Sequence, residues 1–118
     1  MTAIARLHAG PRMSQVVVHA GTAWLSGQLA LDARGADVGT QTRAILARID
    51  ALLAEAGSNR GRILSATIWL TDMAGFDAMN AEWDAWLPAG CAPARATVGA
   101  ALALPGFDVE IAVVAAVA

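Results

Sequence analysis

Lysine and tyrosine are missing from this chain of 118 residues, and cysteine occurs only once. Without lysine, the protein can form neither the Schiff base of a pyridoxal phosphate enzyme nor a phosphate-binding loop that depends on a lysine. The single thiol, Cys91, excludes an intrachain disulfide and a cysteine-rich metal site. Two histidines, His8 and His19, are too few for the usual zinc centre. We therefore expect no metal and no cofactor, and any chemistry has to come from arginine, carboxylate, hydroxyl and backbone groups.

Charged residues are also scarce, at 15% of the chain against roughly 25% in ordinary soluble domains. The net charge is −2 and the arginines form no cluster, which argues against binding to nucleic acid or to an anionic membrane surface. No apolar run reaches the roughly 18 to 20 residues of a membrane-spanning helix, and the N-terminal sequence does not have the pattern of a secretory signal. We expect a cytoplasmic protein without membrane association.

The chain is long enough for one domain, residues 1–118, with its own hydrophobic core. Hydrophobic residues make up 57% of it. So high a hydrophobic fraction gives more apolar surface than a domain of this size can bury by itself. We therefore expect an oligomer whose subunits cover one another's apolar faces.

The N-terminal part of the chain has the pattern of β-strands. Residues 14–20 and 22–29 are rich in apolar and β-branched residues and meet at Gly21, which is typical of a β-hairpin. The pattern also allows a short preceding strand over residues 4–8. Residues 32–37 have the composition of a loop.

Two amphipathic helices are predicted further along the chain. In residues 40–56 apolar side chains recur at helical spacing, and Gly57 is placed to end the helix. The second helix covers residues 75–87. Its two tryptophans, Trp83 and Trp86, are expected in the core, because aromatic residues at helical spacing are usually buried.

Three further strands are predicted, over residues 63–71, 95–102 and 108–117. In the first, alternation places one set of side chains under the helices, namely Leu64, Ala66, Ile68 and Leu70, and the other set on the far face, namely Ser65, Thr67, Trp69 and Thr71. The order β-β-α-β-α-β-β predicts an α+β fold, with a mixed β-sheet and two α-helices packed on one face. No helix is left to cover the other face, and Trp69 on that face indicates that a neighbouring subunit covers it.

Arg95 is the only basic residue after Arg62, and it lies among alanines just ahead of an apolar run. A buried cation requires an anionic partner, because an unpaired buried charge is strongly destabilising. That partner is either a protein carboxylate or the carboxylate of a ligand. The protein candidate is Glu110, in a stretch that is otherwise apolar. If the strands of Arg95 and Glu110 pair, the two side chains flank one pocket, and Thr97, which shares the strand parity of Arg95, reaches the same place.

Four local sequences match one known family. They are Trp24-Leu-Ser-Gly-Gln28, the helix segments from Gln41 to Arg43 and from Ile49 to Gly57, Ile68-Trp-Leu-Thr-Asp72 with Phe76, Met79 and Asn80, and Pro93-Ala-Arg95 followed by Val109-Glu-Ile111. The last of these is the most specific. On these motifs the chain resembles, over nearly its whole length, the Rid family (reactive intermediate deaminases, also known as the YjgF family).

The resemblance implies a chorismate-mutase-like homotrimer with a ligand cleft at each subunit interface. It also implies hydrolysis of reactive enamines or imines, such as 2-aminoacrylate, to 2-keto acids and ammonia. Carried over by position, Arg95 would anchor the carboxylate of the 2-imino or 2-keto acid through its planar fork, and Glu110 would position water or transfer a proton. The other members of the implied pocket are Ser26, Gly27, Gln28, Asn80, Thr97 and Met13.

The chain departs from the best-characterised deaminases of this family at three positions. Met13 replaces a tyrosine, Thr97 replaces a cysteine, and Ala92 replaces an aromatic residue, so the implied pocket loses a phenol, a thiol and a ring. Two functions therefore stay open: deamination of a different imine, or a trimer that binds a keto acid or amino acid without turnover. Ribonuclease activity, attributed to some relatives, fits the acidic pI and the missing basic patch poorly.

Structural interpretations stay open for individual residues. Arg95 and Glu110 could form a salt bridge between subunits, and Gly27 could serve only to let two backbone segments approach closely. Asn80 could hydrogen-bond locally within its helix. Asp72, just before the second helix, is expected to cap or turn the chain.

Overall fold

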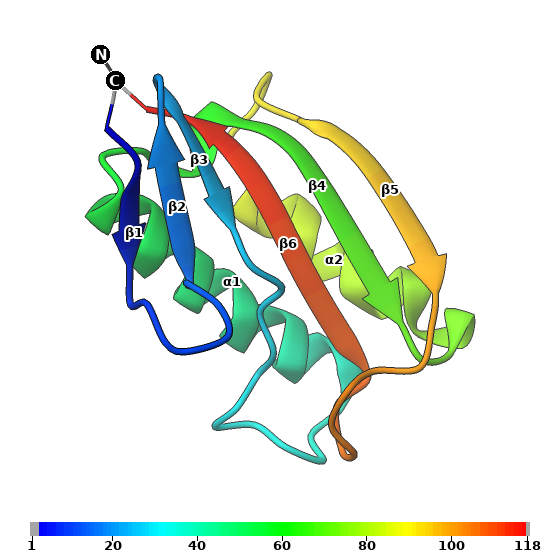
Figure 1. Ribbon diagram of the computed structural model, residues 1–118. Coiled ribbons are helices and arrows are strands. Elements are labelled where there is room, and N and C mark those ends of the chain that lie inside the picture. Colours follow the sequence, from blue (N-terminus) through cyan, green and yellow to red (C-terminus); the bar gives the residue numbers. More distant parts are fainter. Residues whose placement is uncertain (1–2, 118) are drawn as a thin grey trace.

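The computed structural model describes residues 3–117 and shows one six-stranded sheet with both long helices on the same face (Figure 1). In chain order the elements are β1 (Ala5–Leu7), β2 (Val16–His19), β3 (Thr22–Leu25), α1 (Val38–Glu55), η1 (Arg60–Arg62), β4 (Ile63–Leu70), η2 (Met73–Gly75), α2 (Phe76–Trp86), β5 (Ala94–Gly99) and β6 (Val109–Ala116). The strand order is β1-β2-β3-β6-β4-β5; β4 and β5 are parallel, and the other neighbours are antiparallel. The predicted α+β fold is confirmed.

A tight turn joins β2 and β3 at the predicted position. Ala20 and Gly21 both have positive φ angles, 50° and 80°, and they separate the paired residues His19 and Thr22. Two consecutive left-handed residues are the requirement of the turn that best matches the twist of a hairpin.

Helix α1 begins at a capping aspartate and ends at a glycine with a positive φ angle. Asp37 caps the N-terminus by accepting a hydrogen bond from the backbone N–H of Thr40 at 2.7 Å. At the other end Gly57 has a φ of 81°, and the N–H of Ser58 donates to the carbonyl of Leu53 at 2.8 Å. This is the hydrogen-bond pattern of a Schellman motif, so the predicted terminating role of Gly57 is confirmed.

The core lies between the helices and the facing side of the sheet. Its fully buried side chains include Ile45, Ile49 and Leu53 of α1, Met79 of α2, Ile68 of β4 and Ile111 of β6. Trp83 and Trp86 are buried as expected, and their ring centroids lie 5.6 Å apart. Packing against α1 and α2 therefore fixes which side of the sheet is internal.

The predicted orientation of Leu64 is wrong. The register of β4 against β6 shifts between Ile63 and Ser65, so Leu64 is the extra residue of a β-bulge. Ile63 takes the buried position and Leu64 is 53% exposed. From Ala66 onward the predicted alternation is restored.

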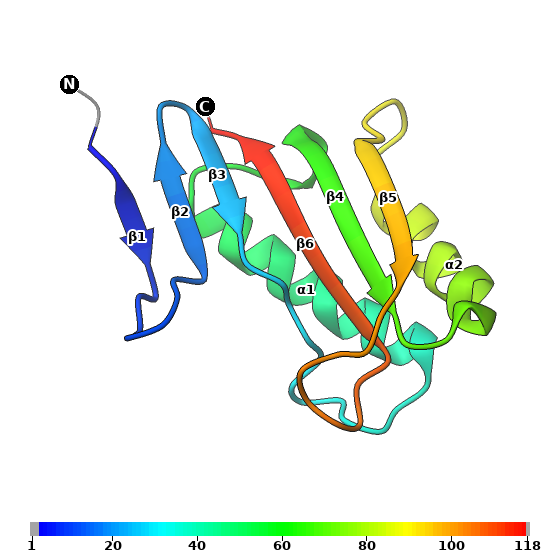
Figure 2. The same cartoon turned by 45° about the vertical axis from the view of Figure 1, so that its right-hand side comes forward.

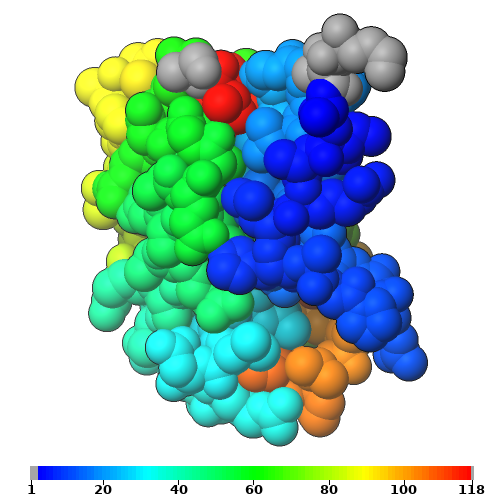
Figure 3. All heavy atoms as spheres, turned by 60° about the vertical axis from the view of Figure 1, so that its left-hand side comes forward, coloured from blue at the N-terminus to red at the C-terminus, as the bar shows by residue number. Residues whose placement is uncertain are grey.

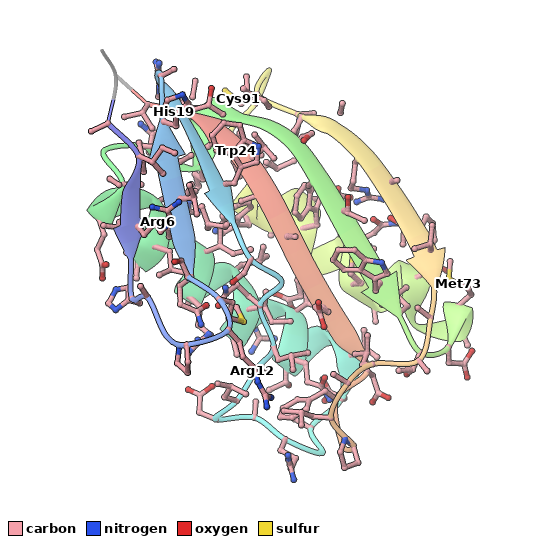
Figure 4. All side chains as sticks on the ribbon, viewed as in Figure 1. Arg6, Arg12, His19, Trp24, Met73 and Cys91 are labelled. Carbon is pink, nitrogen blue, oxygen red and sulfur yellow. The ribbon has the colours of Figure 1, made fainter. Side chains whose placement is uncertain are left out.

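No helix of residues 3–117 covers the other face of the sheet (Figure 2). Trp24, which lies on this open face in Figure 4, is 44% exposed, and Val98 is 43% exposed. Trp69 shares the open face and is half-buried. An aromatic and aliphatic surface of this kind is typical of a protein interface, and cover by a neighbouring subunit stays a prediction.

Within the described part of the chain, no helix is both long and apolar enough to cross a membrane. In the same residues, no three side chains of histidine, cysteine, aspartate and glutamate gather as metal ligands would. The cytoplasmic location stays a prediction.

Candidate functional site

Arg95 lies on the edge strand β5 and faces the helices. It pairs with Ala66 of β4, whose side chain is buried beneath them. The guanidinium lies over two rings of α2, with its carbon 5.5 Å from the ring centroid of Trp83 and 6.0 Å from that of Phe76. Such cation–π contacts are worth about 0.5–2 kcal/mol each and hold the cation in one place.

No acidic partner for Arg95 exists among residues 3–117. The ion pairs in this range are His8–Glu55, Arg43–Glu82 and Arg60–Asp50. Arg95 takes part in none of them and donates no side-chain hydrogen bond to the residues described. The half-buried cation is therefore held by aromatic rings, and its hydrogen-bond donors are left for another molecule.

Two further predicted residues lie beside Arg95. Thr97 pairs with Ile68 and so faces the same side of the sheet, and its Oγ1 is buried without a hydrogen-bond partner in the described chain. Asn80 is half-buried on α2, four residues after Phe76 and three before Trp83, which places it on the same face of the helix. We call Arg95, Thr97 and Asn80 the anchor group.

Glu110 lies on the opposite side of the sheet. Strand β4 separates β5 from β6, and Glu110 pairs with Trp69, whereas Arg95 pairs with Ala66. Because Ala66 and Trp69 are three residues apart, their side chains point to opposite faces. The hypothesis that Arg95 and Glu110 flank one pocket through pairing of their strands is wrong for a single chain.

Gly27 lies directly against the carboxylate of Glu110. Backbone hydrogen bonds between Gln28 and Ile111, at 2.8 and 3.2 Å, attach this segment to β6. A Cβ atom at position 27 would overlap the carboxylate, with Glu110 Cδ only 2.8 Å away. Burial raises the pKa of Glu110 above the ordinary glutamate value. Glu110 and Gly27, with the neighbouring Ser26, form what we call the carboxylate group.

Contrary to its expected place in the pocket wall, the side chain of Gln28 is interior and only 1% exposed. Its Nε2 lies 2.9 Å from Gln15 Oε1 and 3.0 Å from the carbonyl oxygen of Ser26, and its Oε1 accepts a hydrogen bond from Arg48 Nε at 3.3 Å. This buried amide has its hydrogen-bonding capacity used inside the chain. It therefore supports the backbone beside Gly27 from behind.

Met13 and Ala92 are exposed in the loops before β2 and β5, and Met13 is 49% exposed. Cys91, in the same loop as Ala92, is a free thiol. The place of Met13 in a pocket stays a prediction, because a single chain leaves its side chain largely uncovered.

In the described part of the chain, one surface pocket has a volume of about 280 Å³ and another of about 290 Å³, and the linings of these two contain neither Arg95 nor Glu110. One lies between the helices, beside the Arg43–Glu82 and Arg60–Asp50 ion pairs. Because Arg95 and Glu110 face opposite sides of the sheet, the anchor group and the carboxylate group do not make one site within a single chain.

Comparison with known proteins gives consistent relatives. The family model described as Endoribonuclease L-PSP matches residues 3–117. The RutC family protein YoaB of Escherichia coli is 48% identical over 114 residues, which cover 97% of this chain and 98% of that protein. A RutC family protein of Haemophilus influenzae is 39% identical over 112 residues, covering 95% and 97% of the two chains. The crystal structure of a YjgF-family protein from Neisseria meningitidis superposes with a TM-score of 0.94 at 40% identity, covering 98% of this chain and 96% of that one.

Proposed function

This chain belongs to the Endoribonuclease L-PSP family, also called the YjgF or Rid family, and we propose that it hydrolyses reactive imines of small 2-amino acids to 2-keto acids and ammonia. The family is known for oligomers that bind small molecules. Enamines such as 2-aminoacrylate enter the same reaction after tautomerising to the imine.

The observation that carries this proposal is the environment of the Arg95 guanidinium. Its guanidinium is fixed over Trp83 and Phe76 and has no acidic partner among the described residues. Beside it, Thr97 presents a buried hydroxyl that lacks a hydrogen-bond partner in the same part of the chain. A carboxylate next to a polar group would satisfy both side chains, since arginine binds carboxylates bidentately.

The positions of the two groups favour a pocket between subunits. The anchor group faces the helices at the β5 edge, and the carboxylate group lies on the open face of the sheet. One pocket can contain both only if Arg95 comes from one copy and Glu110 from another. We propose a homotrimer in which each interface holds one such pocket, with the exposed side chains of the open face, including Trp24, buried by assembly.

In this pocket Arg95 holds the substrate carboxylate, and the imine carbon lies near Glu110. The deprotonated Glu110 takes a proton from water while the oxygen bonds to the imine carbon; the π pair of the C=N bond moves to nitrogen, which takes up the proton from Glu110. The resulting carbinolamine passes its hydroxyl proton to nitrogen by way of Glu110. The C–N bond then breaks, its electron pair leaves with ammonia, and the C=O bond of the keto acid forms. Burial raises the pKa of Glu110 and so brings its basicity nearer to what the proton transfer needs.

Binding without turnover is the second candidate function. Met13, Thr97 and Ala92 stand where the deaminases that this chain resembles carry a phenol, a thiol and a ring. A trimer that binds a keto acid or amino acid needs only the anchor group. Ribonuclease activity is not proposed, because the net charge is −2 and the sequence has no basic cluster to bind a phosphate backbone.

Turnover is tested by generating 2-aminoacrylate in situ with a dehydratase and following the decay of imine absorbance with and without the protein. Several amino-acid-derived imines should be compared, because the side-chain preference of the pocket is altered. We expect faster decay with the wild-type protein and the uncatalysed rate with Arg95→Ala. Absence of acceleration for every imine would reject the deaminase function and leave the binding function.

The anchor role of Arg95 is tested separately by keto-acid binding. Binding is followed through the NMR signal of the Thr97 methyl group, which lies on the same face of β5 as Arg95. Arg95→Ala should abolish the shift of this signal on addition of a keto acid while sedimentation still shows the trimer. The matched control is Arg43→Ala, which removes an arginine already paired with Glu82. A Thr97 shift retained in Arg95→Ala would reject the assignment, and dissociation of the trimer would support a salt bridge between subunits instead.

A further inference from the structure

The second surface pocket lies between the C-terminal half of α1 and the segment around β1 and β2. Its volume is about 290 Å³, and its lining consists of His8, Gln15, Arg48, Ala51, Leu52 and Glu55. Figure 3 shows the face on which the N-terminal segment, in blue, lies against this part of α1, in green. None of these six residues belongs to the anchor group or to the carboxylate group, so the proposed deaminase site does not account for this pocket.

Arg48 is a fixed and unpaired cation in this pocket. Its Nε donates to Oε1 of the buried Gln28 at 3.3 Å, which holds one edge of the guanidinium. The outer edge, formed by Nη1 and Nη2, donates to no acceptor in residues 3–117, and no carboxylate there lies within ion-pair distance. The side chain is half-buried. A planar pair of donors held in this way matches the two oxygens of a carboxylate.

Gln15 supplies a second donor in the same lining. Its Oε1 accepts hydrogen bonds from Ser26 Oγ at 3.1 Å and from Gln28 Nε2 at 2.9 Å, which sets the orientation of the amide. Its Nε2 is left without an acceptor in the described chain. Two convergent donors on a partly apolar wall, to which Ala51 and Leu52 contribute, are typical of a small-ligand site.

The charges around the pocket select the kind of anion. Glu55 lies in the same lining, with its Oε2 2.5 Å from Nε2 of His8. Apart from His8, the lining therefore has one positive group, Arg48, and one negative group, Glu55, and it offers no excess of positive charge to a doubly charged ligand such as phosphate. We propose that this pocket binds a small monocarboxylate, with Arg48 as the bidentate anchor and the Gln15 amide as the second donor.

The experiment isolates this pocket by using Arg95→Ala as the background, so that the proposed deaminase site cannot bind the probe. Acetate and pyruvate are titrated into this variant, and side-chain amide and guanidinium signals are followed by ¹⁵N NMR. We expect saturable binding that shifts the Gln15 side-chain amide and Arg48 Nε. Adding Arg48→Gln should weaken binding roughly tenfold to hundredfold, as removal of a charge-assisted hydrogen bond does. Adding Arg43→Gln, on the same helix, should leave it unchanged.

Arg48→Lys provides a second variant that keeps the charge and loses the fork, and it should bind with intermediate strength. Equal binding with and without Arg48 would overturn the proposal, as would absence of saturation in the Arg95→Ala background. Tighter binding of inorganic phosphate than of acetate would overturn the assignment to a monocarboxylate. Because Arg95 is absent throughout, these outcomes do not depend on whether the protein is a deaminase.

Discussion

Two inactive variants of this protein should restore activity to each other. Arg95 and Glu110 lie on opposite faces of the same sheet, so a shared pocket has to take them from different chains. Arg95→Ala removes the anchor, and Glu110→Gln removes the base while keeping the shape of the side chain. Each variant alone should lose activity by roughly 10²-fold or more, the usual contribution of a positioned proton-transfer group.

The expected amount of recovered activity follows from the arrangement of three chains in a closed ring with three interfaces. In a mixed trimer, two chains are of one kind and one is of the other. The three interfaces differ in which chain supplies position 95 and which supplies position 110. In either composition, one interface combines an intact Arg95 with an intact Glu110. Mixed trimers should therefore have about one third of the wild-type activity per trimer.

The assay co-expresses the two variants with different affinity tags and purifies the oligomers that carry both tags. Imine hydrolysis is then compared with that of wild-type protein and with each variant carrying both tags, which controls for the tags. Activity that stays at the level of the single variants, in oligomers proven to be mixed, would refute the shared pocket. Recovery to the full wild-type rate would also contradict it, because two of the three interfaces must stay defective.

Three further outcomes are expected. Burial raises the pKa of Glu110 above the ordinary value of 4.5. The hydrolysis rate should therefore increase with pH, and the midpoint of this increase on the acid side of the pH–rate profile should lie above 4.5. A midpoint at or below that value would count against Glu110 as the base. Gly27→Ala should displace the carboxylate and lower turnover roughly tenfold or more with an unchanged circular dichroism spectrum, whereas Gly10→Ala, whose Cβ meets nothing closer than 3.6 Å, should not. Gln28→Met should lower the free energy of unfolding by about 2 kcal/mol in urea denaturation, because the half-buried side chains of Gln15 and Arg48 each lose a hydrogen-bond partner; an unchanged midpoint would contradict this.

Features that depend on neighbouring residues could be predicted from the sequence. The hairpin at Gly21 and the helix end at Gly57 are confirmed. Asp72 caps the turn η2 just ahead of α2, where it accepts a hydrogen bond from the N–H of Ala74 at 2.9 Å. Each is decided by backbone conformation or hydrogen bonds within a few positions. Helix α1 was placed to within two residues at its start and one at its end for the same reason.

Features that depend on distant partners could not be predicted in the same way. The bulge at Leu64 exists because β4 pairs with β6 in a shifted register, and the alternation of β4 alone carries no sign of it. The position of β4 between β6 and β5 is likewise a choice among strand orders that share one sequence pattern. It separates Arg95 of β5 from Glu110 of β6.

The sequence indicates residue types for the proposed site, but it does not indicate how they are arranged in space or which residues support them. Arg48 follows buried Ile45 by three residues and precedes buried Leu52 by four. That spacing was the available sign that it lies at the inner edge of α1. Its hydrogen bond to Gln28 joins residues twenty positions apart, which no local pattern reveals.

The hydrogen-bonded row of Arg48, Gln28, Gln15 and Ser26 has one more consequence. It runs from the pocket on α1 to the backbone beside Gly27, and the two amides and the hydroxyl in it neither gain nor lose a proton in the physiological range. The row contains no carboxylate, imidazole or thiol, so it offers no proton relay between the two places. A change at one place reaches the other along this row as a displacement of atoms.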